Sequence, residues 1–253
     1  MKIYLIASYA QKAQTIYNEI QKDYKDFIVD NYNQADAIVI IGGDGFLLHA
    51  LHTIITVPKP IYGINSGRIG FLLNSYNQED NLIKNIQSAT AYTLPSIIYK
   101  ATNNQQNEAY NEVIFRNELD ICGNFTIIIN NNAYITDLSA DGVLVSTTTG
   151  SSAYNSALNG CMVAPGINCI VITPIGNYNH RNWRGGAIPL DSNIKIKNNN
   201  SNQKTYIKYD NQKHLFTDEV ILTGSIKSKY SILFNTKDYL LEKHLRMQFG
   251  HSS

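Results

Sequence analysis

Along the first ninety or so residues, short apolar runs alternate with segments whose apolar residues recur at helical spacing. Helical spacing predicts one helix over 11–23 and a second after the glycines near residue 43, where Leu47, Leu51 and Ile55 share a face. Strands that alternate with helices are typical of a parallel sheet covered by helices. We therefore expect an N-terminal α/β domain over residues 1–94. The apolar runs predict its strands near 2–8, 26–30, 36–41 and 60–64.

Beyond residue 94 the pattern changes to short segments in which apolar and polar residues alternate with a period of two. This period predicts a β-rich, β-sandwich-like domain over residues 95–226. A small-residue segment at 150–160 favours a short helix. The segment 227–253, with a strand near 230–234 and a helix near 236–247, is expected to pack back on the first domain. The strands of the β-rich domain are predicted near 107–116, 120–129, 132–136, 169–173, 194–198, 204–209 and 219–224.

The strand at 36–41 runs into the turn Gly42-Gly43-Asp44-Gly45, which opens the second helix. The glycines allow positive φ angles and the approach of a ligand to the main chain, and the helix start adds partial positive charge, so the turn suits a phosphate. A carboxylate at such a place predicts a proton acceptor for a hydroxyl that attacks a phosphoryl group. The alternative is a tight turn in which Asp44 only caps the helix.

A second glycine turn, Asn65 to Phe71, follows the strand near 60–64. Ligands of parallel sheets bind at the carboxyl ends of the strands, where both turns fall. We therefore expect the two turns to face one cleft.

Composition limits the partners. The 253 residues are 43% hydrophobic and carry a net charge of +1, which provides no strong field for nucleic acid or an acidic membrane, although Arg181 and Arg184 form a small basic cluster. The three cysteines have neither metal-ligand spacing nor an even count for disulfides, which favours reduced thiols in a cytoplasmic protein. The sequence shows no signal-peptide pattern and no apolar run of membrane-spanning length.

Three polar segments in the β-rich domain add candidate ligand contacts. Asn111-Glu112 lies on or at the end of a strand, and the segment 141–154 joins an acid-glycine turn to a loop rich in hydroxyl groups, which can bind a base edge while Tyr154 stacks on a ring. The turn 209–212 ends in Gln212. Taken singly, each segment is equally consistent with an exposed strand edge or a solvated turn.

In this order the segments resemble the bacterial NAD kinases. The resemblance covers nearly the whole chain and rests on Gly-Gly-Asp-Gly at 42–45, Gly-x-x-Gly-Phe at 67–71, Asn-Glu at 111–112, Asp-Gly-x-x-x-Ser-Thr-x-x-Gly-Ser-x-Ala-Tyr at 141–154, Thr-Pro-Ile at 173–175 and Asp-x-Gln at 210–212. It implies a homodimer or homotetramer that phosphorylates the 2′-hydroxyl of the adenosine ribose of NAD, using ATP or polyphosphate and a divalent cation such as Mg²⁺.

The resemblance also implies roles for individual residues. Asp44 is the expected proton acceptor, and Asn111 with Glu112 resembles the pair that contacts the adenosine and its ribose. Asp141 resembles the acid at the nicotinamide end. His49, one turn into the helix, is placed to reach a phosphate, or is an ordinary helical residue, and Phe71 walls the adenosine pocket or belongs to the core. The remaining expected substrate contacts are Gly45, Thr149, Ser152, Ala153, Tyr154, Ala157 and Gln212.

Four positions depart from the family pattern. Phe46 and Thr148 replace a Thr and a Pro, while Ser152 and Ala157 replace a Thr and a Ser. Phe46 removes a phosphate-facing hydroxyl and so leaves the donor open between ATP and polyphosphate. Ala157 removes a hydrogen bond worth about 0.5–1.5 kcal/mol. The segment 181–186, around the single Trp, resembles the family's region near the partner subunit's site, or is simple interface packing.

Two rival functions remain at this point. A lipid kinase of the diacylglycerol or sphingoid-base type would share the Gly-Gly-Asp-Gly turn, but the segment 141–154 and the absence of a basic amphipathic stretch argue against it. A sensor that binds NAD or NADP without turnover would keep the fold, but the retained Asp44 argues against that reading.

Overall fold

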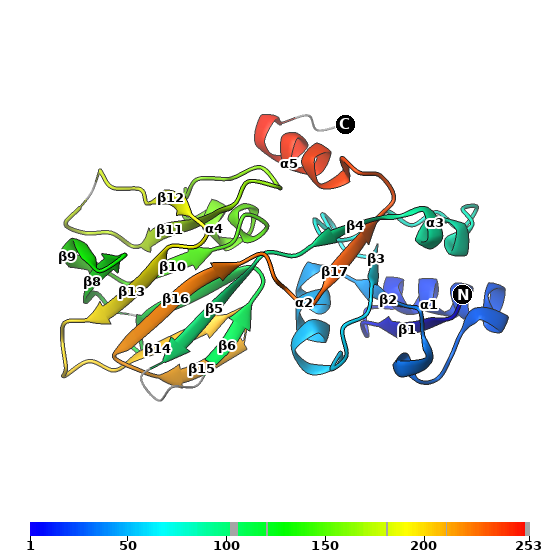
Figure 1. Cartoon of the computed structure of the whole chain (residues 1–253), viewed down its shortest axis with the longest axis horizontal. Coiled ribbons are helices and arrows are strands. Elements are labelled where there is room, and N and C mark those ends of the chain that lie inside the picture. Colours follow the sequence, from blue (N-terminus) through cyan, green and yellow to red (C-terminus); the bar gives the residue numbers. More distant parts are fainter. Residues whose placement is uncertain (102–105, 120, 181, 211, 251–253) are drawn as a thin grey trace. The chain divides into compact units, whose positions relative to one another are not determined.

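The computed structural model describes residues 1–101, 106–119, 121–180, 182–210 and 212–250, with the backbone alone for 213–215 (Figure 1). The chain divides into two compact units. The first combines residues 1–94 with 228–253, and the second comprises residues 95–227.

The first unit is built on a five-stranded sheet in the order β1-β2-β3-β17-β4. Four strands run parallel and β4, at the edge, is antiparallel to β17. The predicted α/β architecture is confirmed. The strands are β1 (Ile3–Ala7), β2 (Ala37–Gly42), β3 (Ile61–Asn65), β4 (Thr90–Thr93) and β17 (Ser231–Phe234), and the helices are α1 (Gln11–Asp23), α2 (Asp44–Thr53), α3 (Leu82–Ser88) and α5 (Tyr239–Phe249).

Burial explains why these elements form. Every residue of β2 is buried, as expected for a central parallel strand. On α1 the buried residues are Ala13, Ile16 and Ile20, at helical spacing, and they join Ile3 and Val39 in one core cluster.

The strand predicted near 26–30 is wrong. This stretch contains a short 3-10 helix (Lys25–Phe27), and Ile28 forms only an isolated parallel bridge to Ile3. The apolar run is three residues long, and a second 3-10 helix (Tyr32–Gln34) follows, with the side chain of Asn31 accepting the Asn33 N–H at 2.9 Å. The stretch is therefore too short to extend a ladder.

The second unit consists of two six-stranded sheets, whose orders are β12-β11-β10-β7-β14-β15 and β6-β5-β16-β13-β8-β9. All the strand pairs in both sheets are antiparallel. A single core cluster draws on both sheets and includes Tyr99, Phe115, Phe125 and Val145. The bounds are β5 (Ser96–Ala101), β6 (Gln106–Ala109), β7 (Glu112–Asn117), β8 (Gly123–Ile129), β9 (Asn132–Ala140), β10 (Gly142–Ser146), β11 (Cys169–Ile175), β12 (Gly186–Pro189), β13 (Asn193–Asn198), β14 (Thr205–Tyr209), β15 (Gln212–Phe216) and β16 (Glu219–Ser225), with a 3-10 turn at Gly150–Ser152 and α4 at Tyr154–Ala157.

The strand predicted over 107–116 is two strands. A bend at Tyr110 and Asn111 separates β6 from β7. β6 pairs with β5 in one sheet, whereas β7 pairs with β10 and β14 in the other. The bend therefore carries the chain from one sheet to the other, and it places Asn111 and Glu112 at the start of β7.

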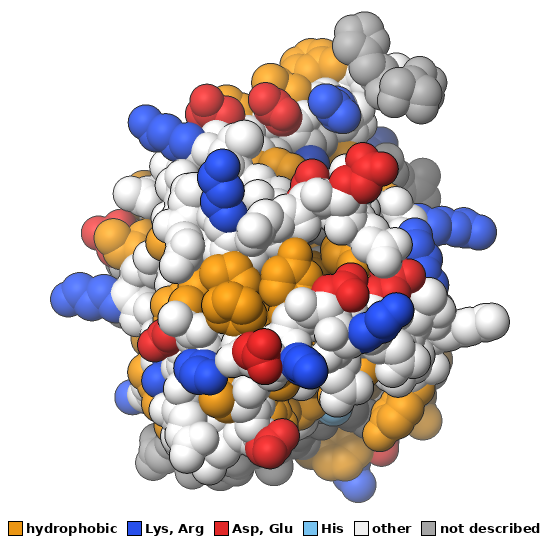
Figure 2. Space-filling model, turned by 90° about the vertical axis from the view of Figure 1, so that its right-hand side faces the viewer, with side chains coloured by type: hydrophobic (Ala, Val, Ile, Leu, Met, Phe, Trp, Pro, Cys, Tyr) orange, Lys and Arg blue, Asp and Glu red, His pale blue; other side chains and the backbone are white. Residues whose placement is uncertain are grey.

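Surface charge is mixed on the face shown in Figure 2, where acidic and basic side chains surround a small group of hydrophobic ones. This mixture matches the net charge of +1. No helix in the described part of the chain is long and apolar enough to cross a bilayer.

Asn74 gives a first test of the fold. Its fully buried side chain donates to the carbonyls of Gly63 (3.1 Å) and Leu233 (2.8 Å) and accepts the Asn235 N–H at 3.0 Å, so it joins β3 to β17. Asn74→Ala leaves these groups without their partner and should lower the free energy of unfolding by about 1–3 kcal/mol in urea denaturation. The exposed Gln78→Ala, as the control, should change it by less than about 0.5 kcal/mol. Equal effects of the two variants would contradict this role.

Candidate active site

Asp44 is the first residue of α2, and Gly43 alone separates it from the buried strand β2. One carboxylate oxygen accepts the N–H of Phe71 and the other accepts the N–H of Leu72, each at 2.8 Å. Both donors belong to the turn that follows β3. The carboxylate is therefore fixed in orientation by two neighbouring backbone amides and is more than a helix cap.

Two of the glycines around Asp44 leave open space beside the main chain, as predicted, but none of the three uses a positive φ angle. None of Gly42, Gly43 and Gly45 has a positive φ angle, so the expectation of left-handed backbone here is wrong. A Cβ at Gly43 or Gly45 would meet no atom within 4 Å, whereas one at Gly42 would lie 2.7 Å from the ring of Phe46. Gly43 and Gly45 thus keep the main chain open to a ligand, and Gly42 allows Phe46 to pack closely.

The second glycine turn adjoins the first. The Ser66 N–H donates to the Gly42 carbonyl at 2.8 Å, and a Cβ on Gly67 would lie 3.7 Å from the Cα of Gly43. Gly70 has a φ of +60°, and a Cβ there would collide with the side chain of Asn65. The carboxyl ends of β2 and β3 therefore form one glycine-lined edge beside Asp44.

Two further predicted residues of this unit differ in exposure. His49 is on the exposed face of α2, where its Nε2 lies 3.2 Å from the hydroxyl of Thr53. The side chain of Phe71 is buried, and its backbone N–H is what reaches Asp44.

In the second unit, Asp210 organises the start of β7. This buried residue, with a φ of +41°, accepts the backbone N–H groups of Tyr110 (2.6 Å), Asn111 (2.7 Å) and Glu112 (3.2 Å). Only Gln212 of this turn is a predicted contact, and Asp210 is not among the predicted site residues. The available signal was an acid two residues before the predicted Gln, but the amides that it binds lie about 100 residues earlier in the chain.

Glu112 is buried beside Asp210, with only 7% of its surface exposed. Burial, and then the negative charge of Asp210, raise the pKa of the Glu112 carboxyl to about 8, although Lys208 acts in the opposite direction. Its Oε2 and the Oγ of Ser146, the residue paired with it on β10, are buried without a hydrogen-bond partner within the described residues. Adjacent unsatisfied polar atoms of this kind are typical of a site that a ligand completes.

The hydroxyl-rich loop after β10 packs directly on this pair. The hydroxyl of Thr147 donates to the Tyr110 carbonyl at 2.7 Å and lies 2.9 Å from that of Thr149. A Cβ on Gly150 would lie 2.1 Å from the Asn111 carbonyl oxygen, so only glycine permits this approach. The structure therefore brings the loop and the Asn111-Glu112 pair together, as the motif order suggested.

The remaining loop residues differ in exposure. Ser152 and Ala153 are half-buried, while Tyr154 and Ala157 are exposed. The hydroxyl of Ser152 donates to the Thr149 carbonyl at 3.2 Å. Gln212 is the first residue of β15, paired with Tyr209 across the turn. Asn211 in that turn and Arg181 of the basic cluster lie outside the described residues.

Asp141 lies at the opposite end of β10 from Ser146. Glu112 pairs with Ser146, whereas Gly142, next to Asp141, pairs with Arg116. Five residue steps along the strand place Asp141 about 17 Å from Ser146. The carboxylate accepts the hydroxyl of Tyr178 at 3.3 Å, and its charge raises the pKa of that phenol. Within one chain, Asp141 is therefore not brought to the other predicted contacts.

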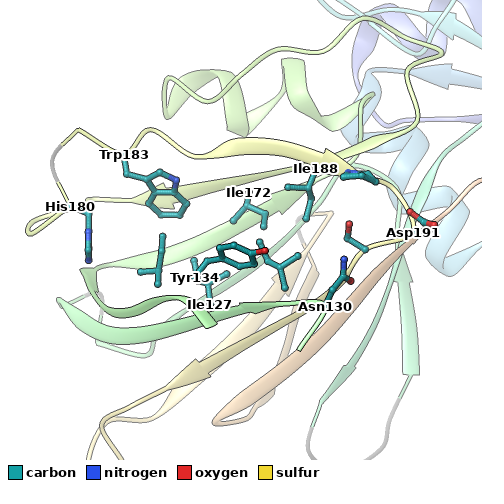
Figure 3. Close-up of a pocket in the computed structure, with 12 residues that line it drawn as sticks. Ile127, Asn130, Tyr134, Ile172, His180, Trp183, Ile188 and Asp191 are labelled. Carbon is teal, nitrogen blue, oxygen red and sulfur yellow. The ribbon is translucent and has the colours of Figure 1, made fainter. Parts of the chain in front are cut away.

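A cavity of about 830 Å³ opens between the hairpin β8–β9 and the strands β11 and β12 (Figure 3). Trp183, Tyr134 and Ile172 point toward one another within it, with Asn130 and Asp191 at the opposite end from His180. The residues that line it include none of the predicted site residues.

Comparison with known proteins decides the family. Residues 4–92 match the ATP-NAD kinase N-terminal domain and residues 110–233 the ATP-NAD kinase C-terminal domain. The NAD kinase of Rickettsia bellii is 32% identical over 98% of both chains, and that of Xylella fastidiosa strain Temecula1 is 31% identical over 98% of this chain and 96% of its own. The chain belongs to the NAD kinase family.

Solved structures agree on the fold of this NAD kinase. The yeast NADH kinase complexed with NADH has a TM-score of 0.80 at 19% identity, covering 100% of this chain and 89% of its own. The NAD kinase of Archaeoglobus fulgidus in complex with ATP has a TM-score of 0.78 at 19% identity, covering 98% and 99%. Members of this family are phosphotransferases, so the predicted kinase activity is confirmed, whereas the role of the Gly-Gly-Asp-Gly turn stays a prediction.

The buried Glu112 predicts a pH-dependent stability for the NAD kinase. Between the ordinary pKa of a glutamate, 4.5, and about 8, the folded protein keeps a proton that the unfolded chain has released. The contribution of Glu112 to the free energy of unfolding is therefore present below this window and is lost as the pH rises through it.

Urea denaturation at pH 5.5 and pH 8 should show that raising the pH lowers the free energy of unfolding more in the wild-type protein than in Glu112→Gln. The exposed Glu118→Gln serves as the control and should behave like the wild type. A wild-type protein and a Glu112→Gln variant with the same pH dependence would contradict the raised pKa.

Proposed function

We propose that this NAD kinase transfers a phosphoryl group from ATP to the 2′-hydroxyl of the adenosine ribose of NAD, with Asp44 as the proton acceptor. The observation that carries the proposal is the carboxylate of Asp44, oriented by the amides of Phe71 and Leu72 on an open glycine turn. Each carboxylate oxygen has a second lone pair, so both hydrogen bonds are compatible with accepting a proton.

In this reaction the 2′-oxygen attacks the terminal phosphorus of ATP in line. The new oxygen–phosphorus bond forms as the bond to the bridging oxygen breaks and ADP leaves, while Asp44 takes the proton of the hydroxyl. The backbone amides of Gly43 and Gly45, at the start of α2 and with open space beside both residues, suit the phosphoryl oxygens. The work of the protein is mainly to position the reacting groups.

We assign recognition of the dinucleotide to the second unit. A ribose hydroxyl can both donate and accept, and it would satisfy the buried Glu112 Oε2 and Ser146 Oγ together. With a pKa of about 8, Glu112 is largely protonated at neutral pH and can itself donate. The further contacts that we propose are His49 and Phe71 from the first unit and Asn111, Thr149, Ser152, Ala153, Tyr154, Ala157 and Gln212 from the second.

The phosphoryl donor is proposed to be ATP, with polyphosphate as the alternative. The ATP complex of the Archaeoglobus fulgidus relative supports ATP, and the NADH complex of the yeast relative makes NADH a second acceptor to assay. The described residues hold no group of three or more His, Cys, Asp or Glu side chains suited to a metal. Mg²⁺ would therefore arrive with the nucleotide, held mainly by the phosphate oxygens, and would neutralise charge on the phosphoryl group.

We further propose a cytoplasmic homo-oligomer. Asp141, a strand length away from Glu112, is suited to contact the nicotinamide end of a dinucleotide held by a second copy of the chain. Trp183, in the segment expected near the partner, lines the cavity of Figure 3 beside the exposed Tyr134, an apolar surface that a second copy would cover. Light scattering during size-exclusion chromatography measures this directly, and a monomer at micromolar concentration would exclude it.

Replacement of the proposed proton acceptor gives the main test. Asp44→Asn should lower the rate of NADP formation from NAD and MgATP by about 10²–10⁴. NAD binding, measured by calorimetry, should stay within about threefold of wild type, because the acid acts on the transition state. NADP is quantified with a dehydrogenase that accepts only NADP. Asp26→Asn, an exposed acid of the same unit, should leave the rate unchanged.

Other outcomes separate the alternatives. Equal loss of rate and of NAD binding in Asp44→Asn would make the acid a substrate anchor. Wild-type protein that binds NAD without turnover, with either ATP or polyphosphate, would indicate a sensor. Phosphorylation of a diacylglycerol or a sphingoid base in place of NAD would indicate a lipid kinase.

A further inference from the structure

Lys243 on α5 contacts the turn whose backbone amides, at Phe71 and Leu72, donate to Asp44. Its ammonium donates to the carbonyl oxygens of Gly70 and Leu73, the latter at 2.5 Å, and lies 4.5 Å from the centre of the Tyr239 ring. The side chain is partly buried, and burial lowers the pKa of the ammonium. An ammonium that is partly removed from water needs hydrogen-bond acceptors, and these two carbonyl oxygens supply them.

The geometry links this ammonium to Asp44 through a single peptide group. The Gly70 carbonyl and the Phe71 N–H belong to the same peptide unit. Lys243 donates to the carbonyl oxygen of that peptide, and the Phe71 N–H of the same peptide donates to Asp44 Oδ2 at 2.8 Å. A cation on the carbonyl side polarises the peptide and strengthens the hydrogen bond that the N–H makes to the carboxylate.

We propose that Lys243 is a positioning residue for Asp44: it holds and polarises the Gly70–Phe71 peptide, and thereby fixes the orientation of the carboxylate. The inference rests on the proposed function, in which Asp44 accepts the proton. Among the described residues, the titratable groups that interact with the ammonium are Tyr239 on its own helix and Asp44 at the start of α2.

Attachment of α5 does not depend on the ammonium alone. The hydroxyl of Tyr239 accepts the Ser75 N–H at 2.9 Å, and its ring stacks on Phe234 at 5.5 Å. Leu240 and His244 bury their side chains from the same helix. Loss of the Lys243 charge should therefore leave the helix in place and alter mainly the turn that faces Asp44.

The test compares Lys243→Met with Arg246→Met, a charge removed from an exposed position of the same helix. Lys243→Met should lower kcat about tenfold and leave the KM for NAD within about twofold, because the peptide that orients the carboxylate is no longer held in place. Lys243→Arg should restore most of the rate. Arg246→Met should change neither kcat nor KM.

A double variant tests whether Lys243 acts through Asp44. Asp44→Asn with Lys243→Met should be no slower than Asp44→Asn alone, because the group that the lysine positions is already absent. Rate losses that multiply, or a KM for NAD that rises as much as kcat falls, would overturn the inference. An active Asp44→Asn would instead refute the proposed function itself.

Thermal unfolding establishes that each variant is folded. Where Lys243→Met does not fold, Lys243→Gln replaces it, since the amide keeps a donor for one carbonyl but carries no charge. The loss of kcat should then be smaller, with the KM for NAD again unchanged. A Gln variant with the wild-type kcat would overturn the inference as well.

Discussion

The carboxylate of Asp44 accepts hydrogen bonds from two backbone amides of one turn. The buried carboxylate of Asp210 accepts hydrogen bonds from three backbone amides at the start of β7. In both units a side-chain acid closes a backbone turn whose N–H groups point away from any ladder. Such hydrogen bonds to a charged acceptor are strong, and a buried amide without one would be costly. The two proposed halves of the reaction therefore depend on the same constraint, a side-chain carboxylate whose oxygens hold the main chain in place.

Close packing against glycine complements these acids. Gly150 lets the hydroxyl-rich loop lie against the Asn111 carbonyl, and Gly70 lets the second turn curl over Asn65. Gly43 and Gly45, by contrast, leave free space beside Asp44. Glycine thus has two opposite effects in this chain: it permits dense contact between segments at some positions and leaves open space beside the main chain at others.

Local patterns predicted much of this arrangement. The run of β-branched residues before Gly42 and the helical spacing after Asp44 placed the acid at a strand-to-helix junction, because both signals lie within a few residues of it. Sequence reasoning failed where the partner is distant. Asp210 lies 98–100 residues from the amides it holds, and Lys243 lies 173 residues from Gly70. Apolar periodicity also did not predict the bend between β6 and β7, because a change of sheet leaves the alternation of apolar residues unchanged. It wrongly predicted a strand at 26–30, where Ile28 forms only a single bridge.

The place of β17 in the first sheet has a consequence for biosynthesis. This strand lies between β3 and β4, yet it follows both in sequence after the whole second unit, residues 95–227. During translation the N-terminal strands emerge early and wait with β3 unpaired on one side, while the continuous second unit can fold first. The helix that carries Lys243 is made later still. The surroundings of Asp44 therefore cannot be completed until β17 and α5 have left the ribosome, and termination before residue 231 yields an incomplete first sheet with an open edge at β3.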